Sequence, residues 1–220
     1  MDLIVFPGGG SPTNPRYAKV YSAIDVEARG AGYENVDLSV SYPSHFTDNP
    51  SGASGMRFDT AVARALEAVM RHEERGAKYD ILARSFGCLI AAKIACDHRP
   101  RNLRRLVIWG PPPFWRLWEM LVLDIDAISA EGRQKGVLLD RETFGTLVPF
   151  EHLLPSIACD AVIATGTNDR VCSPEHVRYL EALHGAPRFS FRVVEGAPHE
   201  VSPDNVSAEV LAAYADALFR

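Results

Sequence analysis

The chain has 220 residues, of which 47% are hydrophobic and 23% charged, and its formal net charge is -5. This ordinary balance excludes a disordered or collagen-like chain, and no apolar run approaches the roughly 20 residues that a membrane span needs. The sequence has no basic stripe to neutralise phosphates, so we expect no nucleic-acid partner. At this length we expect a single α/β domain over residues 1–220.

The N-terminal residues and the cysteines indicate in which cellular compartment the protein is expected. The opening sequence, MDLIVFPGGG, has no basic segment and only a short apolar stretch, so it predicts no signal peptide. The four cysteines, Cys88, Cys96, Cys159 and Cys172, have no C-x-x-C spacing, which argues against a zinc or redox motif. Reduced thiols fit a cytoplasmic protein, and that is the location we expect.

Short apolar runs alternate with helical patterns along the chain. The runs predict strands at Leu3–Phe6, Val36–Val40, Tyr79–Ala83, Leu106–Trp109, Ala161–Thr165 and Phe189–Val194. The helical patterns cover residues 15–30, 58–75, 86–97, 174–184 and 205–219. Most runs are apolar at consecutive positions, as in strands covered on both faces. The alternation predicts a three-layer α/β/α fold around a mostly parallel sheet of about six strands.

The stretch from residue 111 to residue 155 is too long for a simple crossover. It begins with three prolines and then carries an apolar stripe formed by Phe114, Trp118, Leu121, Ile125 and Ile128. The stripe predicts an amphipathic helix, followed by a short helix near residues 141–148. We interpret 111–155 as a small helical cap over one edge of the sheet; the alternative is that the stripe only packs on the body.

The sharpest local signal is the sequence DILARSFGC, in which an apolar strand runs into Ser85 and an apolar helix follows at once. A serine on so tight a strand-to-helix turn has strained backbone angles, and the residues two before and two after it must be small. Ala83 and Gly87 meet this requirement. Such a turn places the hydroxyl at a helix N-terminus, where unpaired N–H groups can bind a developing oxyanion. The alternative is that Ser85 only caps the helix.

A serine hydroxyl needs a base to take its proton. His199 lies in a loop after the last predicted strand and before the last helix, which suits that role. The other histidines are at helix ends, in a first turn, or in loops without a strand close before them, and we interpret them as surface or capping residues: His45, His72, His98, His152, His176 and His184.

The base in turn needs a carboxylate to orient it. Asp169 follows a predicted strand that ends near Gly166, at the sheet edge where ligands bind in open α/β folds. It could also be only a turn residue, because Asn-Asp is favourable turn chemistry.

Three consecutive glycines, residues 8–10, follow the first strand directly. Without side chains, their backbone N–H groups can face a ligand, and one of them would form an oxyanion hole with the N–H of Phe86. A phosphate loop is the competing interpretation, but the sixth position of G-x-G-x-x-G is Thr13 and no Walker lysine is present.

The glycine loop, Ser85, Asp169 and His199 each follow a different predicted strand, and together they resemble the α/β-hydrolase family. The resemblance covers nearly the whole chain, with the family's N-terminal strand hairpin missing and Ala83 in place of a glycine. It implies Ser85 as nucleophile, His199 as base and Asp169 as its orienting acid. It also implies Gly9 and Phe86 as oxyanion donors, with Gly10 as a substitute for Gly9.

We therefore expect a serine hydrolase that cleaves an ester or thioester of a small or medium, largely apolar acyl group through an acyl-enzyme, without metal or cofactor. The expected substrate-binding residues are Arg84, Phe114, Trp115, Trp118 and Leu121. Arg84 could bind a substrate anion, or be solvated or paired with a nearby acid. The same triad could serve an acyltransferase or an amide or carbon–carbon hydrolase, or be vestigial in a ligand-binding module. A homodimer through an edge strand or exposed tryptophans is possible.

Overall fold

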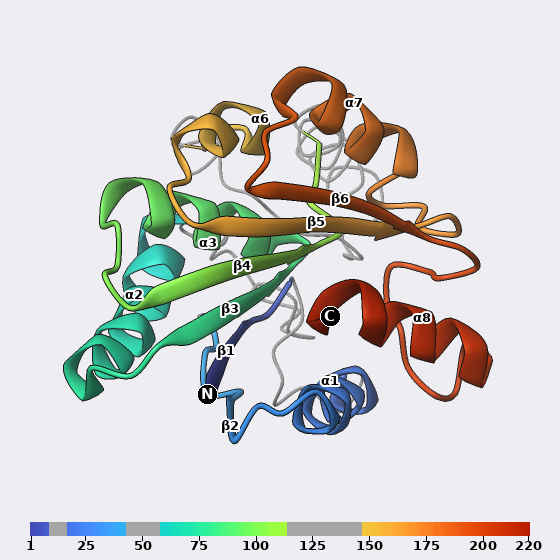
Figure 1. Cartoon of the computed structure of the whole chain (residues 1–220), viewed down its shortest axis with the longest axis horizontal. Helices are drawn as coiled ribbons and strands as arrows, with labels where there is room; N and C mark the ends of the chain where they lie inside the picture. The colour runs from blue at the N-terminus through green and yellow to red at the C-terminus, as the bar shows by residue number, and fades with distance from the viewer. Residues whose placement is uncertain (9–16, 43–57, 114–146) are drawn as a thin grey trace, which may run out of the picture.

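A computed structural model describes residues 1–8, 17–42, 58–113 and 147–220, and its strands form one sheet in the order β2-β1-β3-β4-β5-β6 (Figure 1). All neighbouring strands are parallel. The strands are β1 (Asp2–Phe6), β2 (Asn35–Asp37), β3 (Tyr79–Arg84), β4 (Leu103–Trp109), β5 (Asp160–Gly166) and β6 (Phe189–Val194). The predicted α/β fold with a parallel sheet of about six strands is confirmed.

Helices cover both faces of this sheet (Figure 1). One face packs against α1 (Ala18–Gly30) and α8 (Ala208–Phe219). The other packs against α2 (Phe58–Arg75), α3 (Phe86–Asp97), α6 (Phe150–Leu153) and α7 (Pro174–His184), with a short 3-10 helix, η1 (Leu154–Ser156), after α6. Side chains alternate between the faces: Ile81 and Ala83 of β3 join the α2/α3 core, whereas Leu82 joins the α1/α8 core. Burial on both faces explains the consecutive apolar runs.

Two strands differ from their predicted bounds for local electrostatic reasons. The strand expected at residues 36–40 ends at Asp37, whose Oδ1 accepts the N–H of Ser39 at 2.8 Å and so turns the chain out of the ladder. Strand β4 begins earlier than expected, because Arg104 and Arg105 are neutralised on the fully buried carboxylate of Asp80. Because Arg104 and Arg105 are charged, the apolar run begins only at Leu106, and the hydrophobic pattern misses the first residues of the strand.

The helices largely follow their predicted ranges. The last helix, α8, begins at Ala208 rather than near residue 205, because the Oγ of Ser207 accepts the N–H of Val210 and caps the helix there. Most of the predicted cap at 111–155 lies outside the described residues; the described part contains α6 and η1. Across the described ranges, no helix has both the length and the apolar character that crossing a membrane requires.

The parallel sheet gathers four loops at one edge. The chain leaves β1 for β2 on one side and returns to β3 on the other, so β1 and β3 form a switch point of the kind that binds ligands in open α/β sheets. Gly8 and Ser85 follow these two strands directly, and Asp169 and His199 lie in the loops after β5 and β6. The candidate residues therefore lie at the carboxyl edge of the sheet.

Candidate active site

Ser85 occupies a strained turn between β3 and α3. Its backbone angles are φ 50° and ψ -124°, in a region that non-glycine residues rarely adopt. The backbone N–H of Ser85 donates to the carbonyl of Trp109 at 2.9 Å, which ties the turn to the end of β4. Strain of this kind costs about 1–3 kcal/mol and is concentrated at functional sites.

Two glycines allow this turn to be packed closely. A Cβ on Gly87 would lie 2.4 Å from the carbonyl oxygen of Pro7, and a Cβ on Gly8 would lie 2.9 Å from the Cβ of Ser85. The loop after β1 therefore lies against the serine, as the sequence predicts. Phe86 is the first residue of α3 and lies in its N-terminal turn, where N–H groups have no helical partner. The expected donor Gly9 and its substitute Gly10 lie outside the described residues.

Asp169 and His199 are brought together from loops 30 residues apart in the sequence. The Nδ1 of His199 lies 2.7 Å from the Oδ2 of Asp169. The other carboxylate oxygen, Oδ1, accepts the backbone N–H groups of Val171 and Cys172 at 2.8 and 2.7 Å. These two bonds fix the rotation of the carboxylate and leave Oδ2 for the imidazole.

The loop that carries Asp169 is also closed at its base. The hydroxyl of Thr165 lies 2.6 Å from the carbonyl oxygen of Cys172 and 3.3 Å from the Oδ2 of Asp169. A hydroxyl has one proton to donate, and the shorter contact indicates that it goes to the carbonyl. Thr165 therefore stabilises the loop more than it solvates the carboxylate.

The turn after β4 joins the serine to the acid–base pair, and the sequence reasoning missed it. Gly110 has φ 60°, and a Cβ there would lie 3.0 Å from the Cε1 and Nδ1 of His199 and 3.1 Å from the Oδ2 of Asp169. The preceding residue, Trp109, binds the N–H of Ser85 through its carbonyl. A glycine directly after a strand and before Pro111 was the available signal.

The pairing of the serine with the histidine is incomplete in this structure. Among the described residues, no hydrogen bond joins the Oγ of Ser85 to the ring of His199; the hydrogen bond of this ring is the one from Nδ1 to Asp169, which leaves Nε2 for the serine. Catalytic hydrogen bonds are often long without substrate and tighten when it binds. Both residues contact the same turn at Trp109 and Gly110, so the rearrangement required is local.

Arg84 does not lie where a substrate-binding residue should be. Its side chain is only 4% exposed, and its Nη2 donates to the carbonyl of His199 at 3.0 Å. It points to the same face of the sheet as Leu82, two residues earlier, because side chains alternate along a strand. The expected contact with a substrate anion is not supported by this location, and neither a solvated nor an acid-paired guanidinium describes it.

Cys88 and Cys172 are buried thiols close to these residues. The Sγ of Cys88 lies 3.4 Å from the carbonyl oxygens of both Ala83 and Trp109, and burial raises the pKa of this thiol. Ligand atoms of Asp169, Cys172 and His199 all lie within 4.8 Å of one another. The carboxylate of Asp169 is already bonded to the imidazole and to two backbone amides, so the arrangement fits an acid–base pair better than a metal centre.

Two histidines interpreted as surface or capping residues are in fact buried. His72 is 3% exposed, with Nδ1 3.2 Å from the Oδ2 of Asp2 and Nε2 3.3 Å from the Oδ2 of Asp37. His176 is 1% exposed and stacks on Tyr179, and desolvation lowers its pKa to about 4. Both lie on the inward faces of their helices, where a single histidine replaces an apolar residue and escapes the hydrophobic pattern.

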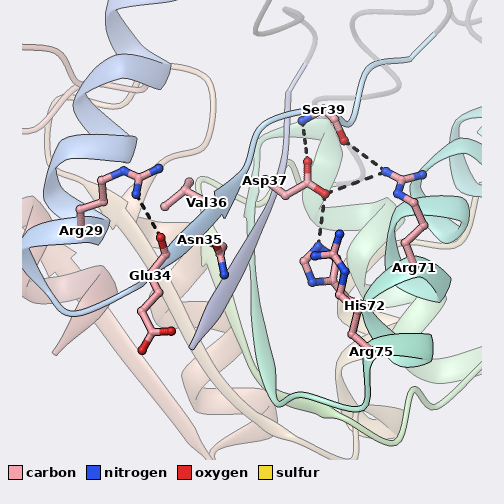
Figure 2. Close-up of a pocket in the computed structure, with 9 residues that line it drawn as sticks. All are labelled: Arg29, Glu34, Asn35, Val36, Asp37, Ser39, Arg71, His72 and Arg75. Carbon is pink, nitrogen blue, oxygen red and sulfur yellow. Dashed lines mark hydrogen bonds and ion pairs between the residues drawn. The ribbon is translucent and has the colours of Figure 1, made fainter.

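A surface cavity of about 410 Å³ lies beside His72, next to the edge strand β2 (Figure 2), and Ser85 is not among its lining residues. The carboxylate of Asp37 is paired with Arg71 and His72 in its lining and accepts the N–H of Ser39. The lining residues are Arg29, Glu34, Asn35, Val36, Asp37, Ser39, Arg71, His72 and Arg75. The cavity is therefore a charged hollow at the sheet edge, separate from the candidate active site. The expected pocket residues Phe114, Trp115, Trp118 and Leu121 lie outside the described residues.

Comparison with known proteins identifies the fold to which the chain belongs. No protein-family model and no curated protein matches the chain. Several solved structures match it over most of its length. An alpha-beta serine hydrolase homologue from Coxiella burnetii is 21% identical, with a TM-score of 0.55 over 100% of this chain and 83% of that one. An esterase from Pyrococcus furiosus is 15% identical (TM-score 0.63, 98% and 79% of the two chains).

A third similar structure is the N-formylmaleamic acid deformylase from Pseudomonas putida S16, which is 16% identical (TM-score 0.60, 97% and 91% of the two chains). These proteins share with this chain an arrangement that spans almost all of its length. Together with the all-parallel sheet, the similarity shows that the protein has the α/β-hydrolase fold.

Proposed function

We propose that the protein is a serine hydrolase that cleaves an ester or thioester with a small or medium, largely apolar acyl group. The observation that carries the proposal is the 2.7 Å contact between Asp169 and His199, at the sheet edge where Ser85 holds a strained turn. A carboxylate held on the Nδ1 of an imidazole selects the tautomer whose Nε2 can accept a proton. The names of the similar structures, two hydrolases and a deformylase, agree with this class of chemistry.

The reaction proceeds by covalent catalysis. Ser85 Oγ attacks the acyl carbonyl and its proton passes to the Nε2 of His199, while the charge that develops on the imidazolium is stabilised by Asp169. The N–H groups of Phe86 and Gly9 bind the oxyanion, and each such donor is worth about 3–4 kcal/mol of transition-state stabilisation. His199 then protonates the leaving group. In the second half, it activates the water that releases the acid.

A fluorophosphonate probe and a panel of p-nitrophenyl esters and thioesters of increasing chain length test the proposal. We expect the wild-type protein to be labelled and to turn over the esters, and the Ser85→Ala protein to do neither. Ser190→Ala is the matched control, because this half-buried serine lies at the start of β6, away from the carboxyl edge. Equal turnover in the Ser85→Ala and wild-type proteins would refute the mechanism.

The same experiment separates hydrolysis from acyl transfer. Adding an alcohol, amine or thiol during turnover should leave the product acid dominant if water is the natural acceptor. A product dominated by the transferred acyl group would assign the triad to an acyltransferase. An unlabelled but folded wild-type protein that binds an apolar ester tightly would instead favour a binding module.

A further inference from the structure

The carbonyl oxygen of His199 accepts two hydrogen bonds from buried side chains. The Nη2 of Arg84 and the Nε1 of Trp109 each lie 3.0 Å from it. These donors are the last residues of β3 and β4, and they are 4% and 0% exposed. Both donors therefore extend from the ends of buried strands. They bind the backbone of His199, whose imidazole contacts Asp169.

Arg84 is an unusual residue to bury at this position. Among the described residues, its guanidinium has no carboxylate within ion-pair distance and lies 5.7 Å from the ring centre of Tyr21, in a region closed by Tyr214. Burying a cation without a paired anion is costly, and an apolar side chain of similar size would often be more stabilising. Desolvation lowers the pKa of Arg84, but its interactions with Tyr214, Tyr21 and Glu200 outweigh this effect and raise it, so the site is built to hold a guanidinium.

Through Tyr21, the guanidinium is also linked to the loop after β1. Burial raises the pKa of Tyr21, and hydrogen bonds with Arg84 and with the backbone of Gly8 oppose that rise. Gly8 in turn packs against Ser85 and precedes Gly9. Arg84 and Tyr21 together therefore connect the loop that carries His199 with the loop after β1, and Arg84 is the residue next to Ser85.

We propose that Arg84 is a positioning residue, which together with Trp109 clamps the carbonyl oxygen of His199 and holds the imidazole against Asp169 and toward Ser85. The inference rests on the proposed function for its catalytic meaning. The clamp acts from the α1/α8 face, below the sheet edge, so it touches neither the substrate nor the reacting atoms.

The test uses Arg84→Met, Trp109→Phe and the double variant in the full chain. Arg188→Met is the matched control, because Arg188 also donates to backbone carbonyls and also lies over an aromatic ring, at the opposite end of β6. Each single variant leaves one donor on the carbonyl, and we expect kcat for a p-nitrophenyl ester to fall about tenfold with KM within about twofold, as for a displaced catalytic group. In the double variant, kcat should fall by a larger factor than the two single-variant factors multiplied together, because the buried carbonyl oxygen of His199 is then left without a donor.

A proton NMR measurement makes the result independent of turnover. The Nδ1 proton shared by His199 and Asp169 should give a far-downfield resonance in the wild-type and Ser85→Ala proteins and none in Asp169→Asn. We expect this resonance to be broadened or lost in Arg84→Met and kept in Arg188→Met. Should Arg84→Met fail to fold, Trp109→Phe, which keeps an aromatic ring, carries the same test.

The outcomes separate the two proposals. Unchanged kcat and an unchanged resonance in folded Arg84→Met and Trp109→Phe overturn the clamp. A wild-type protein that neither labels nor hydrolyses esters, but whose resonance is lost in the Arg84 variant, refutes the proposed function and leaves the clamp standing.

Discussion

Replacing Gly110 with alanine should lower activity as well as stability. The new Cβ would lie 3.0 Å from the Cε1 and Nδ1 of His199, where ordinary contacts begin at 3.4 Å. The backbone of Gly110 cannot retreat easily, because its N–H donates to the carbonyl of Ala164 at 2.8 Å. The imidazole must therefore move by at least about 0.4 Å. Since a displacement of about 1 Å costs roughly 100-fold in rate, we expect a loss of about sixfold or more in kcat.

Gly76 supplies a matched control for backbone strain. It has φ 71°, close to the 60° of Gly110, but a Cβ there would meet nothing within 4 Å. Alanine at either position should cost about 1–2 kcal/mol for the left-handed conformation, which for a chain of this size lowers the Tm by about 2–8 °C. Only Gly110→Ala should also lower the rates of ester hydrolysis and fluorophosphonate labelling. Equal kcat values in the two variants, both folded, would refute the reasoning.

Three further predictions concern groups whose environment is well defined. Asp169→Asn should lower ester turnover by about 10³–10⁴-fold, because the two amides on Oδ1 turn the new NH₂ group toward His199 and impose the wrong tautomer. His176 has a folded pKa of about 4 against 6.5; the unfolded chain binds more protons between these values, so stability falls as pH decreases through this window, by about 2 kcal/mol from pH 7 to pH 5. His176→Gln should remove that part of the pH dependence in urea unfolding. Asp80→Ala should cost about 1–3 kcal/mol by calorimetry, since it removes the acceptor from Tyr33 and from the partly buried Arg105, whereas Arg104, which is 45% exposed, can be solvated.

Each of these has a clear contradicting result. Full activity in Asp169→Asn would remove the carboxylate from the mechanism. An unchanged difference in unfolding free energy between pH 7 and pH 5 in His176→Gln would show that His176 is not the titrating group; the exposed His98→Gln is its control. A Tm for Asp80→Ala within about 2 °C of the wild type would mean that its buried charges do not contribute to stability.

Most of the architecture follows from the pattern of apolar residues. The consecutive apolar runs at β1, β3 and β5 predict a sheet covered on both faces, and the structure has one. What the pattern could not predict is where charge is neutralised inside the fold. Arg104 and Arg105 belong to a strand because Asp80 lies opposite them, and that pairing is visible only once β3 and β4 are neighbours.

The candidate site was predictable in part for the same reason. Ser85, Asp169 and His199 each follow an apolar run, so their order and place in the chain point to one sheet edge. The sequence also indicates that Arg84 is buried. Arg84 lies two residues after Leu82 on the same strand, so its side chain points to the face that α1 and α8 cover. The position of Gly110, directly after a strand and before Pro111, marks a turn, but its close approach to His199 depends on three-dimensional packing that no spacing along the sequence encodes.

The reactivity of the buried Cys88 thiol can report how often the structure around it opens locally. Its sulfur lies beneath the turn of Ser85, held against two backbone carbonyls, and burial keeps it in the unreactive thiol form. Cys96 and Cys159 are partly exposed and would react first. In a chain where Cys96, Cys159 and the buried Cys172 are all serine, the rate at which a thiol reagent modifies Cys88 would measure the transient opening of the turn that carries Ser85, three residues earlier in the chain.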